Sequence, residues 1–252
     1  MAKILAFGDL THTFIEKNDY KGFFLPGYIK HPSYEQLNDV LGRFDLCRID
    51  HVGAPQLFGE LNPTIEKYYK QLDWHHFFGV DEKTIRTETS SLRATVISDF
   101  DENVKMPLFE EGPGPKKSQT REFLEYNNGP GIQHIAMETN DIITAVENLK
   151  RRGVEFLPAV PAYYDVCREK LGEIGLTIDE DLEVLKKNDI LLDFDENGYL
   201  LQIFTKHIQD RPTLFLELIQ RKNHNGFGVG NFGRLFEAIE REQAKRGNLT
   251  AI

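Results

Sequence analysis

Apolar residues in the first half of the chain form short strand-like runs and one helical repeat. The helical repeat covers residues 61–72, where Ile65, Tyr68 and Leu72 return at intervals of three and four residues. The strand-like runs are separated by polar turns, and they cover residues 46–53, 74–80, 92–98 and 106–110. The predicted order is βαβββ, with the first strand ending in His51.

The same order begins again after a Gly- and Pro-rich loop at 112–117 and a turn at 127–131. The second module is predicted to start with a strand around His134 and a helix at 142–152, followed by two more helices. Its remaining strands are predicted at 154–157, 190–194, 199–206 and 214–220. Two such modules, about 46–112 and 131–221, predict an α+β fold with an open, cupped sheet.

An amphipathic helix is predicted near the end of the chain, at about 230–246. Asn231 is placed to cap its start, and Gly247 lies just past its end. Phe232 and Phe236 fall on one apolar face of this helix, which would pack against the rest of the protein.

Composition limits the function classes without selecting one. A net charge of −10 disfavours nucleic acid or an anionic membrane surface as the main partner. The two cysteines, Cys47 and Cys167, are too few for a disulfide framework and favour the reducing cytoplasm. Residues 1–10 lack the apolar run of a signal peptide, and no segment approaches the roughly 20 apolar residues of a membrane span. We therefore expect a soluble intracellular protein.

Three predicted strands each carry one potential metal ligand: His51, His134 and Glu217. Two histidines and one carboxylate form the facial triad of non-haem iron(II) oxygenases, which leaves positions open for dioxygen and substrate. Glu217 is the most informative, because a carboxylate between apolar neighbours is costly to bury unless it is paired or metal-bound. The alternatives are hydrogen-bonded core histidines and a structural salt bridge of Glu217 with Arg211 or Arg221.

Several longer motifs occur in the order of one known family. They are Gly131-Ile132-Gln133-His134, residues 198–206, Gln209-Asp210-Arg211-Pro212, residues 214–217 and residues 223–232. The likeness continues upstream through residues 8–13, Asp50-His51, residues 90–93, Lys105-Met106-Pro107 and Lys117-Ser118-Gln119. On these motifs nearly the whole chain resembles the 4-hydroxyphenylpyruvate dioxygenases. The resemblance implies the vicinal-oxygen-chelate fold of glyoxalases and bleomycin-resistance proteins, built from paired βαβββ modules.

The resemblance also implies a specific reaction and site. His51, His134 and Glu217 would hold Fe(II), and 4-hydroxyphenylpyruvate and O2 would give homogentisate and CO2 in tyrosine and phenylalanine catabolism. Catalytic glutamines lining the pocket would be Gln119, Gln133 and Gln202. Further pocket positions would be Phe204, Phe215, Phe227, Asn231 and Phe232. The terminal helix would gate the site, and a homodimer is a further expectation.

The chain departs from the family pattern at two pocket positions. Ala94 stands where the family usually has a serine, and Phe109 stands where it has an asparagine. Both lost side chains belong to the polar network that orients the substrate, and such polar specificity is worth several kcal/mol when it is complete. A hydroxymandelate-synthase-like arylpyruvate oxygenase, with altered regiochemistry or substrate, is therefore the alternative.

Family chains carry a further N-terminal domain, and residues 1–40 are expected to be its remnant plus a linker that includes residues 26–32. A lone hairpin formed by residues 2–7 and 12–16 would be marginal in water, so it should either dock on the catalytic domain, residues 41–252, or be mobile. A truncated, non-catalytic paralogue is the alternative from another class. A zinc or nickel isomerase on the same fold is disfavoured by the keto-acid motifs.

Overall fold

The structure is a computed structural model that describes residues 1–30, 35–81 and 85–251. Within the last helix, three side chains also lie outside this description: those of Val229, Phe232 and Arg234. The predicted linker at 26–32 is therefore described only as far as residue 30.

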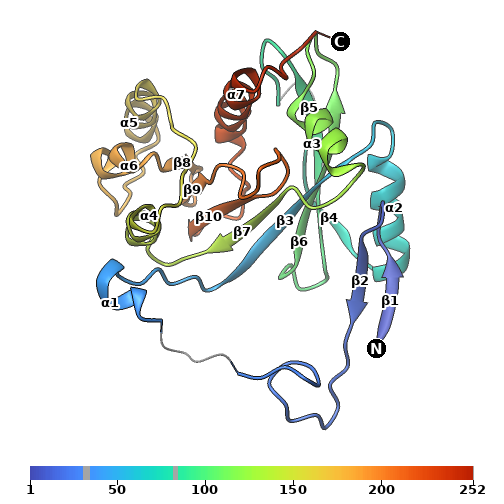
Figure 1. The fold of residues 1–252 in the computed structure, drawn as a ribbon. Helices are drawn as coiled ribbons and strands as arrows, with labels where there is room; N and C mark the ends of the chain where they lie inside the picture. The colour runs from blue at the N-terminus through green and yellow to red at the C-terminus, as the bar shows by residue number, and fades with distance from the viewer. Residues whose placement is uncertain (31–34, 82–84, 252) are drawn as a thin grey trace.

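One eight-stranded sheet forms the body of the protein, in the order β4-β5-β6-β3-β7-β10-β9-β8 (Figure 1). Its strands are β3 (Arg48–Gln56), β4 (His75–Val80), β5 (Ser91–Ser98), β6 (Lys105–Gly112), β7 (His134–Glu138), β8 (Leu191–Phe194), β9 (Tyr199–Phe204) and β10 (Phe215–Lys222). In each module the first strand pairs in parallel with the last, as β3 with β6 and β7 with β10. The two first strands, β3 and β7, pair antiparallel in the middle of the sheet. The α+β prediction of two βαβββ modules in one open sheet is confirmed.

The described residues form seven helices, of which the first and the third were not predicted from the sequence. They are α1 (Leu37–Leu41), α2 (Leu61–Leu72), α3 (Gln119–Asn127), α4 (Ile142–Arg151), α5 (Ala162–Ile174), α6 (Leu182–Asn188) and α7 (Val229–Lys245). In Figure 1, α7 stands between the β8 side of the sheet and α3, and it contacts both elements. Among the described residues, none of these helices has the length and apolar character that crossing a membrane requires.

Three local predictions were wrong. The first strand runs past His51 to Gln56. Residues 154–157 form no strand and contribute one isolated bridge, Phe156 to Thr205. The Val154 N–H donates to the Leu149 carbonyl oxygen at the end of α4, and Pro158 has no N–H, so neither can extend the pairing. Asn231 does not cap the terminal helix. Gly228 occupies the cap position with φ +74°, and the Asn231 side chain, one turn inside, accepts a hydrogen bond of 2.7 Å from the Tyr163 hydroxyl.

The N-terminal hairpin docks on the first module. Strands β1 (Ala2–Leu5) and β2 (Thr11–Phe14) lie beside α2 in Figure 1. Ala6 and Phe7 are buried in the apolar cluster beneath α2. Lys67 Nζ donates to the Ala6 carbonyl oxygen at 2.9 Å, and His12 Nε2 lies 2.6 Å from the Tyr68 hydroxyl. Of the two expectations for this hairpin, docking is the one observed.

Candidate metal centre

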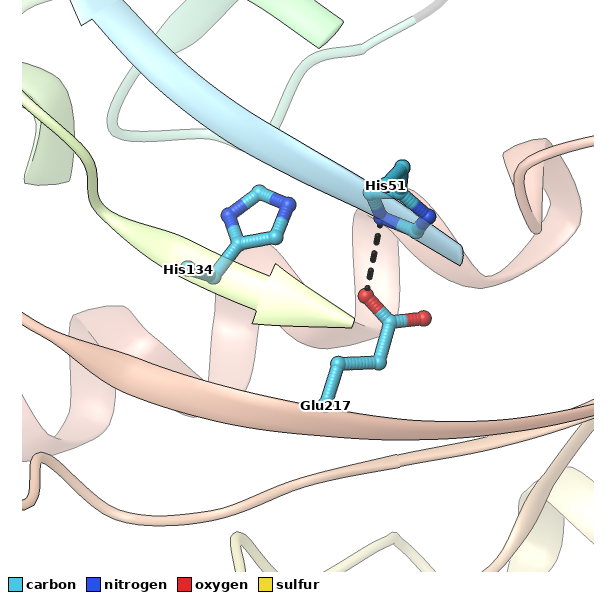
Figure 2. A group of neighbouring side chains, drawn as sticks. All are labelled: His51, His134 and Glu217. Atoms are coloured by element: carbon cyan, nitrogen blue, oxygen red, sulfur yellow. Dashed lines mark ion pairs between the residues drawn. The ribbon is translucent and has the colours of Figure 1, made fainter. Parts of the chain in front are cut away.

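The register of three central strands places His51 next to Glu217. On β3, β7 and β10 the residues His51, Ala136 and Glu217 are direct partners, and cross-strand partners point to the same face of a sheet. Ala136 is fully buried and its methyl group leaves the space above β7 open. His51 Nε2 therefore lies 3.3 Å from Glu217 Oε2 across the intervening strand (Figure 2).

The adjacent row of the same three strands holds His134. Its partners are Gly53 on β3 and Phe215 on β10, each two residues from the first row and therefore on the same face. Gly53 has no Cβ, and one added there would stand 2.0 Å from His134 Cε1. The Phe215 ring stacks on the imidazole with centroids 5.2 Å apart. His134 is thus held against a bare backbone on one side and a phenyl ring on the other.

A β-bulge in β3 supports His51. The register of β3 on β7 shifts between Ile49 and His51, so Asp50 is the extra residue. Its Oδ1 lies 2.7 Å from His51 Nδ1, which leaves Nε2 to face Glu217. Arg221 Nε and Nη2 donate to both oxygens of Asp50 at 2.8 and 2.9 Å. Arg221 therefore pairs with Asp50, and the predicted alternative of an Arg221–Glu217 salt bridge is not what the structure shows.

Burial and charge give the two histidines opposite protonation. Burial alone would lower the pKa of His51, but the Glu217 and Asp50 carboxylates outweigh it and raise the pKa to about 9. Burial, with a smaller effect of charged His51, lowers the pKa of His134 to about 3. Burial also opposes ionisation of Asp50, yet hydrogen bonds from Arg221 and His51 hold its pKa well below the usual range. At neutral pH, His134 is therefore neutral and His51 is protonated.

The donor set fits a divalent metal ion. His51, His134 and Glu217 each offer one ligand atom, and these atoms all lie within 4.8 Å of one another. Two imidazoles and one carboxylate suit non-haem Fe(II), and a carboxylate behind one ligand histidine is a common support of metal sites. The geometry is therefore compatible with a metal ion held by these three residues.

A mostly apolar cavity of about 680 Å³, open solvent at its mouth included, adjoins the three ligand candidates. Of the residues predicted to form the site, it is lined by Ala94, Phe109, Gln119, Gln133, Phe204 and Phe227 together with His51, His134 and Glu217. Residues that the sequence analysis did not assign to the pocket also line it: Phe78, Val80, Ile85, Leu92, Val96, Pro107, Leu235 and Phe236. The apolar face predicted for the terminal helix, which includes Phe236, is the signal that pointed to part of this set.

Two of the predicted glutamines form a buried pair at the cavity. Gln133 Nε2 donates to Gln119 Oε1 at 2.7 Å, and Gln133 Oε1 lies 3.3 Å from His134 Nδ1. The third, Gln202, is fully buried and does not belong to the lining of the cavity, and its amide has no hydrogen-bond partner among the described residues. It lies against Gly228, where an added Cβ would stand 2.1 Å from Gln202 Oε1.

The other predicted pocket residues take different positions. Phe215 supports the His134 ring, and Asn231 is buried with its Oδ1 bonded to Tyr163. Neither belongs to the lining of the cavity. The side chain of Phe232 lies outside the part of the chain that the structure describes.

Comparison with known proteins places the fold and these motifs in one family. The sequence model of the Glyoxalase/Bleomycin resistance protein/Dioxygenase superfamily matches residues 48–203. The chain belongs to this superfamily. Within it, the chain is 50% identical over 253 residues to a 4-hydroxyphenylpyruvate dioxygenase of Tetrahymena thermophila and 51% identical over 253 residues to one of Danio rerio. The resemblance predicted from the motifs is confirmed.

These alignments cover 100% of this chain but only 63% and 64% of the two relatives. The chain therefore spans less than two thirds of their length. Among solved structures, a mutant of 4-hydroxymandelate synthase from Streptomyces coelicolor is similar, with a TM-score of 0.67 and 34% identity over 77% of this chain and 54% of that one. A xylose isomerase-like TIM barrel/4-hydroxyphenylpyruvate dioxygenase fusion protein, at 23% identity and a TM-score of 0.63 over 79% of this chain and 30% of that one, shares the fold.

Proposed function

We propose that this chain provides the active centre of an Fe(II)-dependent 4-hydroxyphenylpyruvate dioxygenase, which converts 4-hydroxyphenylpyruvate and O2 to homogentisate and CO2. The observation that carries the proposal is the convergence of His51, His134 and Glu217 at the wall of an apolar cavity. The identity of about 50% to dioxygenases of this name over the whole chain supports it.

The cavity suits an aromatic keto acid. Phe78, Phe204 and Phe227 surround space beside the ligand candidates, and aromatic rings pack well against a phenyl ring. The buried Gln119–Gln133 pair supplies polar groups for the keto-acid end close to His134. Bound Fe(II) would supply the site at which the keto acid chelates and dioxygen reacts. The protein's part is to hold the two substrates together and to exclude water from the reacting atoms.

A second candidate reaction is favoured by one structural relationship, that between Ala94 and Phe109. These residues are direct partners on β5 and β6, and both line the cavity. Val80 pairs with Ala94 on the other side, so three apolar side chains form a continuous row across three strands. An apolar row favours a ring end without a hydroxyl, or a shifted ring position. A 4-hydroxymandelate-synthase-like arylpyruvate oxygenase is therefore the alternative, and the structural neighbour of that name supports it.

Product identification separates the two candidates. The protein is loaded with Fe(II) under anaerobic conditions, mixed with 4-hydroxyphenylpyruvate or phenylpyruvate, and then exposed to oxygen. Homogentisate identified by mass spectrometry and NMR supports the dioxygenase, whereas a mandelate-type product supports the alternative. If Fe(II) gives no visible charge-transfer band with either keto acid, and neither keto acid is consumed, both assignments fail.

The proposal extends to the setting of the reaction. We propose a role in tyrosine and phenylalanine catabolism, a cytoplasmic location and a homodimer. The location is supported by the cysteine content, because two cysteines are too few for a disulfide framework. We also propose that residues 41–252 form the catalytic domain, onto which the hairpin of residues 2–14 docks. Size-exclusion chromatography with light scattering tests the dimer.

A further inference from the structure

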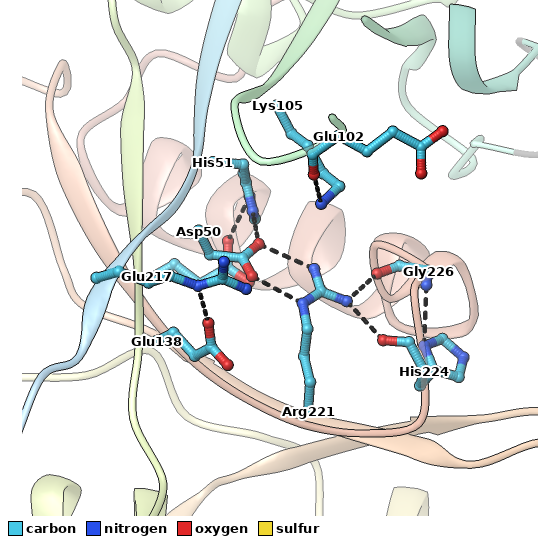
Figure 3. Close-up of polar contacts among 10 residues, drawn as sticks. Asp50, His51, Glu102, Lys105, Glu138, Glu217, Arg221, His224 and Gly226 are labelled. Carbon is cyan, nitrogen blue, oxygen red and sulfur yellow. Dashed lines mark hydrogen bonds and ion pairs between the residues drawn. The ribbon is translucent and has the colours of Figure 1, made fainter. Parts of the chain in front are cut away.

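Arg221 connects the candidate metal centre to the segment that leads into α7. Its Nε and Nη2 donate to the two oxygens of Asp50 at 2.8 and 2.9 Å. Its Nη1 donates to the backbone carbonyl oxygens of His224 and Gly226 at 3.0 and 2.6 Å. One guanidinium thus joins β3 to residues 223–228, here called the entry loop (Figure 3).

Both ends of this connection reach the cavity. At one end, Asp50 bonds His51 Nδ1, whose ring carries the candidate ligand atom Nε2. At the other end, Phe227 of the entry loop lines the cavity, and its ring centroid lies 5.1 Å from that of His51. The guanidinium carbon of Arg221 also lies 5.5 Å from the centroid of the Phe227 ring. A shift of the entry loop would therefore reach His51 by two routes. One is the direct contact of Phe227 with the His51 ring, and the other runs through Arg221 and Asp50.

The connection is well buried. The Arg221 side chain is 12% exposed and that of Asp50 is 3% exposed. Burying two charges to this extent is costly unless each is fully hydrogen-bonded. Two hydrogen bonds of the guanidinium go to the carboxylate of Asp50. Two more go to the backbone carbonyl oxygens of the entry loop. The planar fork of arginine can serve both groups at once, whereas the point charge of lysine cannot reproduce this geometry.

We propose that Arg221 is a positioning residue that links metal binding at His51 to the order of the entry loop and the start of α7. The inference rests on the metal-binding part of the proposed function. A metal on Nε2 fixes the imidazole, and the fixed imidazole holds Asp50 and Arg221 in the arrangement that binds the loop carbonyls. Because such a linkage is reciprocal, metal should protect the loop, and a loosened loop should weaken metal binding.

The test measures metal affinity and loop order together, without turnover. Co(II) affinity is measured by calorimetry, and hydrogen exchange of residues 224–228 is followed with and without metal. In the wild-type chain we expect metal to slow this exchange. In Arg221→Lys we expect about tenfold weaker metal binding, at the lower end of what loss of a ligand's support costs, and loss of most of the metal-dependent protection. Arg48→Met is the control, because Arg48 lies on β3 and also forms an ion pair, with Glu138 on β7, but its side chain is 53% exposed.

A second variant keeps the test decisive if Arg221→Lys folds poorly. Asp50→Asn with Arg221→Met removes both charges, so that no buried charge is left unpaired, and circular dichroism confirms its fold. Wild-type affinity and wild-type loop protection in these variants would overturn the inference while leaving the proposed function intact. A different outcome would overturn the proposed function alone: the metal protects the loop in the wild-type chain and Arg221→Lys abolishes this protection, but the wild-type chain turns over no arylpyruvate. A wild-type chain that binds no Co(II) would overturn both.

Discussion

Gly53 lies beneath the imidazole ring of His134, at a distance that admits no side chain. A Cβ atom added at Gly53 would stand 2.0 Å from Cε1 and 2.3 Å from Nε2 of the histidine. The two residues are partners on β3 and β7, and Phe215 closes the other side of the ring. The position of one candidate ligand therefore depends on the absence of a side chain on the neighbouring strand.

Gly53→Ala should displace His134 from the site. Overpacking of a buried position costs about 1–3 kcal/mol, and we expect a lower melting temperature with at least about tenfold weaker Co(II) binding, which corresponds to roughly 1.4 kcal/mol. Thermal unfolding and calorimetry measure the two effects. Gly172→Ala is the control, because among the described residues no atom outside the neighbouring backbone of α5 lies within 4 Å of the added Cβ. Unchanged metal affinity in Gly53→Ala would show that His134 is not a ligand.

Metal binding should release a proton at neutral pH. The metal-free His51 has a pKa of about 9 and must lose its proton to bind a metal, whereas His134, with a pKa of about 3, is already neutral. We expect about one proton per metal at pH 7.5, and an affinity that rises about tenfold per pH unit until pH 9 and then levels off. Calorimetry in buffers of different ionisation enthalpy counts the protons. Binding without proton release at pH 7.5 would contradict this arrangement of charge.

The same histidine should make the metal-free protein less stable at alkaline pH. The pKa of His51 rises from an unfolded value of 6.5 to about 9 on folding, so the folded state binds the proton more tightly. Its contribution to the free energy of unfolding is complete below pH 6.5 and is lost as the pH rises through 9. Denaturant unfolding of the metal-free chain between pH 6 and 10 measures this loss, and His51→Gln should show none of it. A wild-type profile that matches His51→Gln would mean that His51 is not charged.

Ala94→Ser and Phe109→Asn together should favour a ring hydroxyl. The two positions are direct cross-strand partners at the cavity, so each polar group has the other within reach. We expect the ratio of kcat/KM for 4-hydroxyphenylpyruvate over phenylpyruvate to rise by at least about tenfold in the double variant, since a site fully built to hydrogen-bond a substrate hydroxyl discriminates by about 10000–100000-fold. Each single variant should give less than half of this change in free energy. Additive effects would show that the pair does not contact the substrate as a unit.

Much of this fold follows from local sequence patterns, whereas the site depends on pairing between distant strands. Helix α2 spans the predicted residues 61–72, and Ile65 and Tyr68 of its apolar repeat are buried. Helix α3 was missed, since its apolar pattern is weak and its clearest signal is the Ser118 cap, which accepts a hydrogen bond from the Arg121 N–H. The motifs predicted the three candidate ligands.

The sequence could not show how those ligands come together. The bulge at Asp50 and the alignment of His51 with Ala136 arise from the register of β3 on β7, which no local pattern encodes. The cavity likewise combines Phe78 with Phe236, which lie 158 positions apart in the sequence. Such contacts depend on the tertiary packing of distant elements.

Glu217→Gln should separate a metal ligand from a structural ion pair. The amide keeps the shape of the side chain but loses the charge that faces His51 Nε2 at 3.3 Å. We expect Co(II) affinity to fall by more than about 100-fold, beyond the 10–100-fold typical of residues that only support ligands. Calorimetry measures the affinity, and Glu66→Gln serves as the control because Glu66 forms an exposed pair with Lys70 on α2. If Glu217→Gln changes stability but not metal affinity, the carboxylate serves only to balance the charge of His51, and the metal would have two protein ligands rather than three.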